Sequence, residues 1–510
     1  MDKNFYITTP IYYPSAKPHM GHAYSSIIAD FFARFKKIDG FHVHFLTGTD
    51  EHGLKIQRAA EEKGIDTLKF CDEISEIFRN LSKTLNLSNT DFIRTTEERH
   101  KNSVQYLWDI LFQNDEIYLS KYSGWYSVSD EAFYNEDEIE TIDGKKIAIN
   151  SKSTVEWVDE ESYFFRLSKW EKPLLEFYEE NPDFISPKTR KNEIISFVKS
   201  GLKDLSVSRK SFSWGIKVPN NKDHVIYVWL DALTNYISAL NYPNKENNLF
   251  KNYWPASIHL IGKDILRFHA VYWPAFLLAA KIDLPKKVYG HGWILSGDEK
   301  MSKSKGNILD PLEIIETYGL DPLRYYLIKE VSFGNDGNIS QDRLEDCINS
   351  DLANNFGNLC QRVSTFALNN CNGLIPAKKK FNNEDLLILD EFKSNLENIR
   401  KKIDEQDINY YIDFIVNSLF KANKYFNDQE PWKKKDDQER VNTIVYTTFE
   451  IIRKVSFMLY PIIPESSLKA LKIFSINEKD INFSTIENND YLKPGSKINK
   501  IGILFKKVEK

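Results

Sequence analysis

Residues 4–50 have the sequence NFYITTPIYYPSAKPHMGHAYSSIIADFFARFKKIDGFHVHFLTGTD, and their pattern indicates the class of fold. The opening run is β-prone and reaches a turn at Pro14 and Pro18. A helix pattern ending near Gly40 follows, with apolar residues at steps of three and four: Tyr24, Ile27, Ile28, Phe31, Phe32 and Phe35. Residues 42–50 then predict a buried strand and residues 51–64 another helix. This alternation predicts a parallel α/β sheet.

The pattern changes twice further along the chain. We expect the first half of the α/β domain in residues 1–115 and its second half in 224–309. Residues 116–223 are rich in aromatics, short strands and turns, which indicates an inserted domain. After a linker at 310–350, helix-period apolar positions predict an α-helical bundle in 351–510. This region includes the C-terminal segment, which we expect to be docked back on the body of the protein.

Composition narrows the class of protein. Hydrophobic residues make up 42% and charged residues 28%, and no apolar run reaches the length of a membrane span. The N-terminus lacks a secretory or transit pattern, so we expect a cytoplasmic location. Cys71, Cys347, Cys360 and Cys371 form no C-x-x-C pair, which argues against a zinc knuckle or a disulfide framework. A net charge of −5 does not suggest a nucleic-acid binder, although short basic clusters occur.

Two histidines flank a glycine at the start of the first predicted helix. His19 and His22 are three positions apart, so both side chains lie on one side of its first turn. Orphan backbone N–H groups and the helix dipole make this an anion site, and Gly21 lets a ligand approach the backbone. Taken alone, the motif is more typical of capping or surface histidines than of an anion site. A metal site is a weaker interpretation, since no third ligand has a suitable spacing.

A second polar motif, DEKMSKSKGNILDP, occupies residues 298–311. Lys300 and Lys303 lie among serines in a loop after an α/β unit. Lysine offers a compact charge with three donors, which suits a polyphosphate. A solvated charged loop is the alternative.

Together, the H-x-G-H and K-M-S-K-S motifs resemble those of the class I aminoacyl-tRNA synthetases. Longer blocks over nearly the whole chain are similar to the methionyl-tRNA synthetases: residues 9–25, 45–56, 227–237, 261–277, 288–307, 321–328, 351–362 and 427–433. The resemblance implies a Rossmann-type sheet split by a connective domain, a stem-contact region at 310–350 and an anticodon-binding bundle. It also implies ligation of L-methionine to tRNA(Met) with ATP and Mg²⁺, through methionyl-adenylate. The rivals are another amino acid specificity and a catalytically silent RNA-binding paralogue.

The resemblance assigns the ATP site residue by residue. His19 and His22 contact the phosphates, with Gly21 under the nucleotide. Lys300 and Lys303 close over the pyrophosphate, and these two lysines and two histidines form the catalytic set. Ser302 and Asp264 also belong to the nucleotide side. Mg²⁺ is expected on ATP, held mostly by phosphate oxygens and water.

The resemblance also assigns the amino-acid site. Asp50, at the end of a predicted strand, can pair with the substrate ammonium, and its alternative role is an N-cap for the next helix. An apolar pocket for the thioether consists of Ile11, Tyr13, Trp229, Ala232, Leu233, Tyr236, Ile265, His269 and Trp273. Without the resemblance, each of these residues is typical of a protein core.

For the tRNA anticodon, Trp432 is the stacking candidate, with ordinary bundle packing as its alternative. Asn358 and Arg362 share a helix face and are candidates for reading base edges.

The sequence departs from many relatives in two ways. Residues 122–138 lack cysteine where zinc knuckles occur in the family, so we predict no structural zinc, with Trp125, Tyr126 and Phe133 filling the space. The chain also ends without the appended dimerising domain of some relatives, so we expect a monomer.

Overall fold

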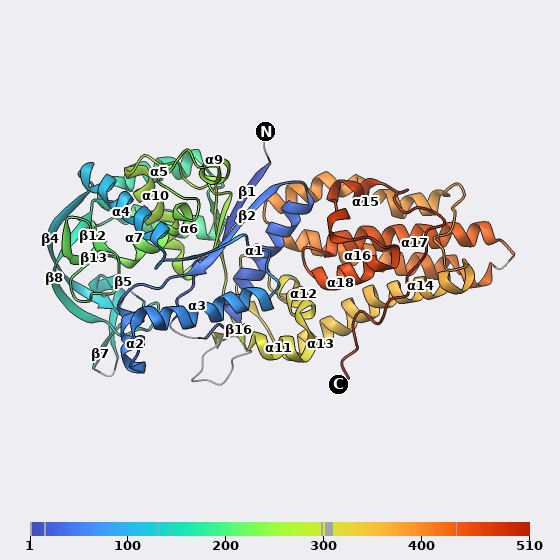
Figure 1. The fold of residues 1–510 in the computed structure, drawn as a ribbon, viewed down its shortest axis with the longest axis horizontal. Coiled ribbons are helices and arrows are strands. Elements are labelled where there is room, and N and C mark those ends of the chain that lie inside the picture. The colour runs from blue at the N-terminus through green and yellow to red at the C-terminus, as the bar shows by residue number, and fades with distance from the viewer. Residues whose placement is uncertain are drawn as a thin grey trace. The chain divides into compact units, whose positions relative to one another are not determined.

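The computed structural model describes residues 3–14, 17–130, 132–142, 144–296, 299–300, 310–434 and 436–509. Two compact units make up the chain (Figure 1). We call residues 4–18 and 43–291 the sheet unit, and residues 1–3, 19–42 and 292–510 the helical unit.

A six-stranded sheet forms the centre of the sheet unit. Its strand order is β3 (Asp91–Arg94), β2 (His42–Thr49), β1 (Asn4–Thr8), β14 (Ile258–Gly262), β15 (Val288–His291) and β9 (Ile185–Ser186). The pairs β2–β3, β1–β14, β14–β15 and β15–β9 are parallel, which confirms the predicted parallel α/β sheet. β1 lies between β2 and β14. The strands that follow β1 directly in the chain, β2 and β3, lie on one side of it, and β14, β15 and β9 lie on the other. In such sheets, ligands bind at the carboxyl ends of the strands where the order reverses.

Helices alternate with these strands along the chain. They are α2 (Leu54–Lys63), α3 (Thr67–Thr84), α4 (Glu98–Gln113), α5 (Glu171–Glu180), α6 (Lys188–Lys199), α7 (Val228–Leu233), α8 (Asn235–Ser238), α9 (Asn248–Tyr253) and α10 (Trp273–Ala279). Their ends follow local chemistry. α2 ends at Gly64 in the left-handed region, where glycine carries no Cβ penalty, and Asp66 caps α3 by accepting from the Lys69 N–H.

Antiparallel sheets are inserted between the halves of the parallel sheet. The four-stranded sheet has the order β10 (Leu205–Ser206), β8 (Glu156–Phe165), β4 (Ile117–Ser127) and β5 (Ala132–Tyr134). The three-stranded sheet has the order β11 (Ser208–Arg209), β13 (Asn221–Ile226) and β12 (Lys217–Val218), and β6 (Ile139–Ile142) pairs with β7 (Lys145–Ala148). The short β9 also comes from the region between residues 116 and 223, yet it joins the parallel sheet.

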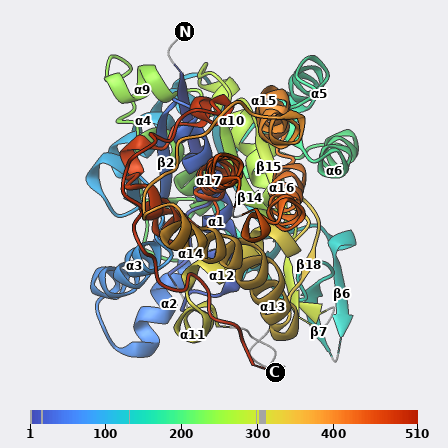
Figure 2. The same ribbon diagram turned by 90° about the vertical axis from the view of Figure 1, so that its right-hand side faces the viewer.

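The helical unit contains a bundle of long helices. In Figure 2, α17 (Gln438–Leu459) is seen almost end-on, with α14 (Asn358–Asn370), α15 (Asn383–Asp404) and α16 (Ile408–Gln429) around it. α17 is buried along nearly its whole length. Besides short 3₁₀ turns, this unit also contains α1 (Met20–Ile38), α11 (Pro311–Tyr318), α12 (Leu320–Glu330), α13 (Gln341–Cys347), a π-helix (Ile348–Gly357) and α18 (Pro464–Leu471). Its strands are β16 (Ile294–Ser296), β17 (Glu299–Lys300) and β18 (Gly337–Asn338).

Helix α1 is more deeply buried than its pattern suggests. The predicted apolar face is buried, but so are polar residues on the other sides of the helix. Asp30 is fully buried and accepts from Arg34 at 2.7 Å and from Arg324 of α12 at 2.6 Å. Two guanidinium groups therefore compensate the buried carboxylate, and this allows α1 to pack on all sides.

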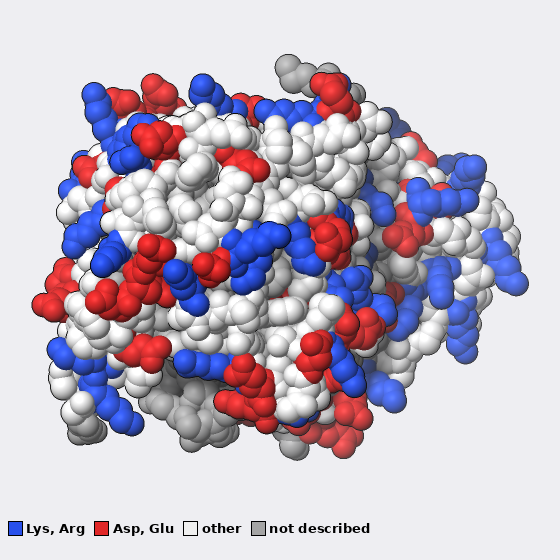
Figure 3. Space-filling view, turned by 60° about the vertical axis from the view of Figure 1, so that its left-hand side comes forward, with Lys and Arg blue, Asp and Glu red and all other residues white. Residues whose placement is uncertain are grey.

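The C-terminal segment is docked on the helical unit, as predicted. The Val508 N–H donates to Asn349 Oδ1 at 2.9 Å, and Lys497 forms a bridge with Leu374. One face of the molecule shows acidic and basic side chains interspersed, in keeping with the small net charge of −5 (Figure 3). Among the helices of the described ranges, none has the length and apolarity needed to cross a membrane.

Candidate active site

The two histidines of the first motif cap the start of α1. His19 is the N-cap, and its Nδ1 accepts a hydrogen bond from the Gly21 N–H at 3.1 Å. The backbone N–H of His19 in turn donates to Nδ1 of His22 at 3.1 Å. The two rings stack with 3.8 Å between their centroids. The capping interpretation and the anion-site interpretation are therefore compatible, because only one nitrogen of each ring is used by the cap.

These hydrogen bonds determine the tautomers of both rings. An Nδ1 that accepts from a backbone N–H carries no proton, so a neutral ring carries its proton on Nε2. Desolvation holds the pKa of His22 well below its usual range, and the adjacent His19 adds to this effect. His22 is therefore neutral at pH 7, with a fixed Nε2–H donor. Such preset donors can stabilise an oxyanion without reorganisation.

Gly21 has a reason of its own to be a glycine. A Cβ at this position would lie 3.0 Å from Cε1 and 3.1 Å from Nδ1 of His19. A side chain here would therefore require the His19 ring to shift by a few tenths of an ångström. This steric role adds to the predicted role of Gly21 under a nucleotide.

The second motif lies mostly beyond what the structure describes. Ser302 and Lys303 are outside the described residues, and Lys300 is described only as backbone, in β17. Their predicted contacts with phosphate stay predictions.

Asp50 follows directly on β2, at the carboxyl edge of the parallel sheet. Its side chain is buried, with 3% of the residue exposed, and its backbone N–H donates to the Tyr12 carbonyl oxygen at 2.9 Å. The following helix begins at Leu54, and its N-cap is Gly53. The alternative role of Asp50 as an N-cap is therefore wrong. The same hydrogen bond brings Asp50 beside the segment that contains Ile11 and Tyr13.

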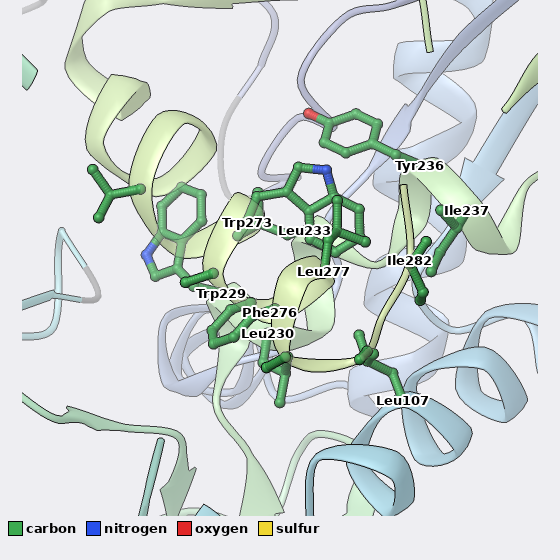
Figure 4. Packing of buried hydrophobic residues seen from close by; sticks show 14 of the residues in the cluster. Leu107, Trp229, Leu230, Leu233, Tyr236, Ile237, Trp273, Phe276, Leu277 and Ile282 are labelled. Carbon is green, nitrogen blue, oxygen red and sulfur yellow. The ribbon is translucent and has the colours of Figure 1, made fainter. Parts of the chain in front are cut away.

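The candidates for the apolar pocket belong to one hydrophobic cluster. Trp229, Leu233, Tyr236 and Trp273 are buried in it and lie close together in Figure 4. Ala232 is buried on α7 beside them, and Ile11, Tyr13 and Ile265 are partly buried residues that pack against the cluster. The structure thus brings together pocket candidates from three separate stretches of sequence.

Two tryptophans of this cluster have unused donors. Nε1 of Trp229 and Nε1 of Trp273 are buried and have no hydrogen-bond partner within the described ranges. The Trp229 ring stacks on Phe268 with 3.6 Å between centroids. A buried donor without a partner is unfavourable, so a ligand acceptor near either indole would be stabilised.

His269 is held in a single protonation state. Its Nδ1–H donates to the Ile265 carbonyl at 2.9 Å, so Nε2 is the acceptor for the Tyr236 hydroxyl at 2.7 Å. Burial lowers the pKa of His269 to about 4. The pair therefore presents a neutral, hydrogen-bonded polar edge inside an apolar cluster.

This pKa predicts acid sensitivity. The unfolded chain binds a proton at His269 near pH 6.5, whereas the folded protein binds it only near pH 4, so stability is lost as pH falls through this window. We expect His269 alone to lower the free energy of unfolding by about 2 kcal/mol between pH 7 and pH 5. Denaturant unfolding at both pH values measures this loss. His269→Gln should show a correspondingly smaller loss, and an equal loss in both proteins would contradict the prediction.

Asp264 and Ile265 lie in the 3₁₀ turn directly after β14 (Lys263–Ile265). Asp264 is exposed, and its side chain lies close to the backbone of Gly262. A Cβ on residue 262 would be only 2.6 Å from Asp264 Oδ1. Both residues are thus at the carboxyl edge of the strand next to β1, where the chain changes direction.

Several polar residues near the pocket were missed by sequence reasoning. His259 is fully buried, stacks on Tyr236 at 4.0 Å and contacts Thr8 Oγ1 through Nδ1 at 2.9 Å. Asp231 binds His52 and His100, each at 2.7 Å. The segments around residues 52 and 231 stood out in the sequence, but nothing in their spacing paired them.

Two of the three candidates for reading the anticodon, Arg362 and Trp432, contact the same aromatic ring. Arg362 lies over the Phe426 ring at 5.7 Å and donates to Asn427 Oδ1 at 2.6 Å. Trp432 contacts the same Phe426 edge-on at 6.1 Å and keeps 40% of its surface exposed. Asn358 is exposed one helical turn before Arg362 on α14. Trp432 is therefore anchored by bundle packing and still offers an open face.

Comparison with known families covers almost the entire chain. Residues 5–364 match the family model of class I tRNA synthetases (M), and residues 375–510 match the anticodon binding domain of methionyl tRNA ligase. A methionine–tRNA ligase from Rickettsia felis is 49% identical over 513 residues, covering 100% of this chain and 99% of the relative. One from Brucella suis is 50% identical, covering 93% of this chain and 92% of the relative.

Solved structures agree with these matches. Mycobacterium tuberculosis methionyl-tRNA synthetase in complex with methionyl-adenylate superposes with a TM-score of 0.96 at 44% identity, over 99% of each chain. The apo form of that protein gives a TM-score of 0.90 at 40% identity, covering 100% of this chain and 99% of the other.

Proposed function

The chain belongs to the methionyl-tRNA synthetases of class I and is a methionine–tRNA ligase, and on this basis we propose which residues perform each part of its reaction. In the first step, the methionine carboxylate attacks the α-phosphate of ATP, forming methionyl-adenylate and releasing pyrophosphate. In the second, a terminal ribose hydroxyl of tRNA(Met) takes the methionyl group, and AMP leaves. No side-chain nucleophile is required, so catalysis consists mainly of positioning and charge stabilisation.

His19 and His22 bind the phosphates of ATP in this proposal. Their Nδ1 atoms are occupied by the helix cap, and the proton of His22 is therefore held on Nε2. The orphan N–H groups of α1 add to the same anion site. Lys300, Ser302 and Lys303 complete it on the pyrophosphate side. Mg²⁺ is carried on ATP, mostly by phosphate oxygens and water.

Methionine occupies the carboxyl edge of the parallel sheet. Asp50 pairs with its ammonium group, and Asp264 lies on the nucleotide side. The thioether enters the cluster formed by Trp229, Leu233 and Tyr236 and their neighbours, since sulfur packs favourably at aromatic edges. The hydrogen-bonded edge of Tyr236 and His269 adds polarity near the sulfur and disfavours purely hydrocarbon analogues.

The tRNA anticodon is read on the helical bundle. Trp432 offers its exposed ring for stacking a base, with Phe426 supporting it from behind. Arg362 and Asn358 contact base edges from α14. The predicted domain bounds and a cytoplasmic location stay predictions.

The observation that supports this proposal is the capped start of α1, where the rings of His19 and His22 stack at the N-terminal end of the helix. ATP–pyrophosphate exchange with a panel of amino acids tests it. We expect exchange that depends on methionine and no other amino acid. A catalytically silent RNA-binding paralogue would bind tRNA without exchange, and exchange driven by a different amino acid would identify another specificity. Either result would contradict the proposal.

We further propose that the inserted sheets need no zinc, because a hydrogen-bonded carboxylate links the segments there. Asp130 accepts from the hydroxyls of Tyr134 at 2.7 Å, Ser151 at 2.5 Å and Ser153 at 2.7 Å. Burial raises the pKa of Asp130, but these donors outweigh it and hold the pKa below its usual range. The sequence predicted aromatic filling instead. Trp125 does pack on Trp157, at 5.2 Å, whereas the side chain of Phe133 lies outside the described residues.

Metal removal tests this part of the proposal. We expect a chelator to leave the melting temperature unchanged, and Asp130→Ala to destabilise the protein by about 1–3 kcal/mol because three hydroxyl donors lose their acceptor. Asp137→Ala, at an exposed neighbour, is the control. Zinc in a one-to-one ratio on elemental analysis would overturn the proposal. We also propose a monomer, and sedimentation at twice the chain mass would contradict it.

A further inference from the structure

A chain of buried polar residues connects three helices of the sheet unit and the segment after β2. Asp231 on α7 is fully buried, and each of its carboxylate oxygens contacts one imidazole. Its Oδ2 lies 2.7 Å from Nδ1 of His52, and its Oδ1 lies 2.7 Å from Nε2 of His100 on α4. The second nitrogen of His100 contacts the Ser238 hydroxyl of α8 at 2.8 Å. We call His52, His100, Asp231 and Ser238 the buried chain.

Each end of the buried chain is next to a proposed methionine contact. His52 lies two residues after Asp50, in the segment that follows β2. Asp231 lies on α7 between Trp229 and the pair Ala232 and Leu233. At the other end, Ser238 shares α8 with Tyr236. The ammonium side and the thioether side of the proposed pocket are therefore linked by directed hydrogen bonds.

We propose that Asp231 is a positioning residue. It fixes the position of the ammonium-binding side of the methionine pocket relative to the thioether-binding side. This inference rests on the function proposed above. A carboxylate with two directed bonds fixes the rotation of α7 about its axis, because both oxygens are engaged at the same time. Rotation of this short helix would move the Trp229 ring and the Leu233 side chain together. Burying the charge of Asp231 costs desolvation free energy. An apolar side chain would avoid this cost if position 231 served only for packing.

Charge compensation within the buried chain supports this role. Burial raises the pKa of Asp231, but His52 and His100 outweigh the effect and hold the pKa below its usual range. Asp231 is therefore ionised, and each histidine donates an N–H to it. An asparagine at position 231 has one acceptor and one donor, so it can satisfy only one of the two rings without a change of tautomer.

The test compares kinetic constants for the two substrates of exchange. For Asp231→Asn and His52→Ala, we expect the KM for methionine to rise roughly 10- to 100-fold, because a charge-assisted buried hydrogen bond is lost. The KM for ATP should stay at the wild-type value. His52→Asn places an amide donor near the position of Nδ1, so it should restore most of the methionine KM.

A matched control separates positioning from stability. Asp385 is a buried carboxylate of the helical unit, paired with Arg440 at 2.6 Å and with Tyr425 at 2.5 Å. Asp385→Asn should lower the melting temperature and leave the methionine KM unchanged. The inference is overturned if Asp231→Asn and His52→Ala keep a normal methionine KM, if both substrates' KM values rise together, or if His52→Asn behaves as His52→Ala. Wild-type protein without methionine-dependent exchange would instead contradict the proposed function, and the inference with it.

Discussion

Replacing His19 with asparagine is expected to lower the rate of methionine-dependent exchange by about 100- to 1,000-fold, the usual effect of removing one preset donor to a developing oxyanion. The melting temperature should stay nearly unchanged. Asparagine is a favoured N-cap, and its Oδ1 can accept from the Gly21 N–H as Nδ1 of His19 does. Its side chain ends near the position of Nδ1, so it offers no donor at the position of Nε2.

Two substitutions of His22, by glutamine and by asparagine, provide the control. They separate the capping role of Nδ1 from the proposed donor role of Nε2. Nδ1 of His22 accepts from the His19 N–H, and Nε2 carries the proposed phosphate donor. His22→Gln should retain more activity than His22→Asn, because the glutamine amide reaches the position of Nε2. His22→Asn should retain more stability, because its carbonyl can replace Nδ1. Exchange rates and thermal melts of the four proteins measure both effects. Wild-type exchange in His19→Asn would contradict the phosphate role.

Replacing Asp50 with asparagine is expected to raise the KM for methionine by about 100-fold or more, because the ammonium group loses its charged partner in a buried site. The KM for ATP should change little. Stability should also change little, because Gly53 and not Asp50 caps α2. If Asp50 acted as the cap, the substitution would affect the melting temperature and leave the methionine KM at the wild-type value.

A methionine analogue without its amino group gives a direct control. This analogue lacks the ammonium, so it should inhibit wild-type protein and Asp50→Asn with similar affinity, although methionine itself distinguishes them. Competition in the exchange assay measures both affinities. If the analogue also loses affinity in the variant, Asp50 acts on the shape of the pocket and not on the ammonium charge.

Local patterns predicted a large part of the fold. The periodicity of residues 20–38 identified a buried helix, and the apolar run at 42–49 identified a strand of a parallel sheet. Local pattern did not show that Asp30 would be buried as well, since that depends on Arg324, which lies 294 positions away. The position of Asp50 at a strand end was predicted, but only the geometry excluded its role as a cap.

Some residues of the candidate site could likewise be predicted from the sequence, and others could be found only in the structure. Motifs that are contiguous in the chain made His19, His22 and Asp50 candidates, because their spacing and neighbours are visible in the sequence. Phe426, which contacts both Arg362 and Trp432, was not predicted because nothing marks it among the other aromatics of its helix.

By itself, the sequence indicated the family of this protein, the parallel sheet and the candidate residues of the two signature motifs, because each of these has a local pattern that is visible in the chain. The tertiary structure alone decided which ring nitrogens form the cap of α1 and which buried groups compensate one another. His52 and Asp231 are 179 positions apart, and His100 and Asp231 are 131 apart. No local propensity specifies such contacts, because they form only when packing brings separate helices to within hydrogen-bonding distance.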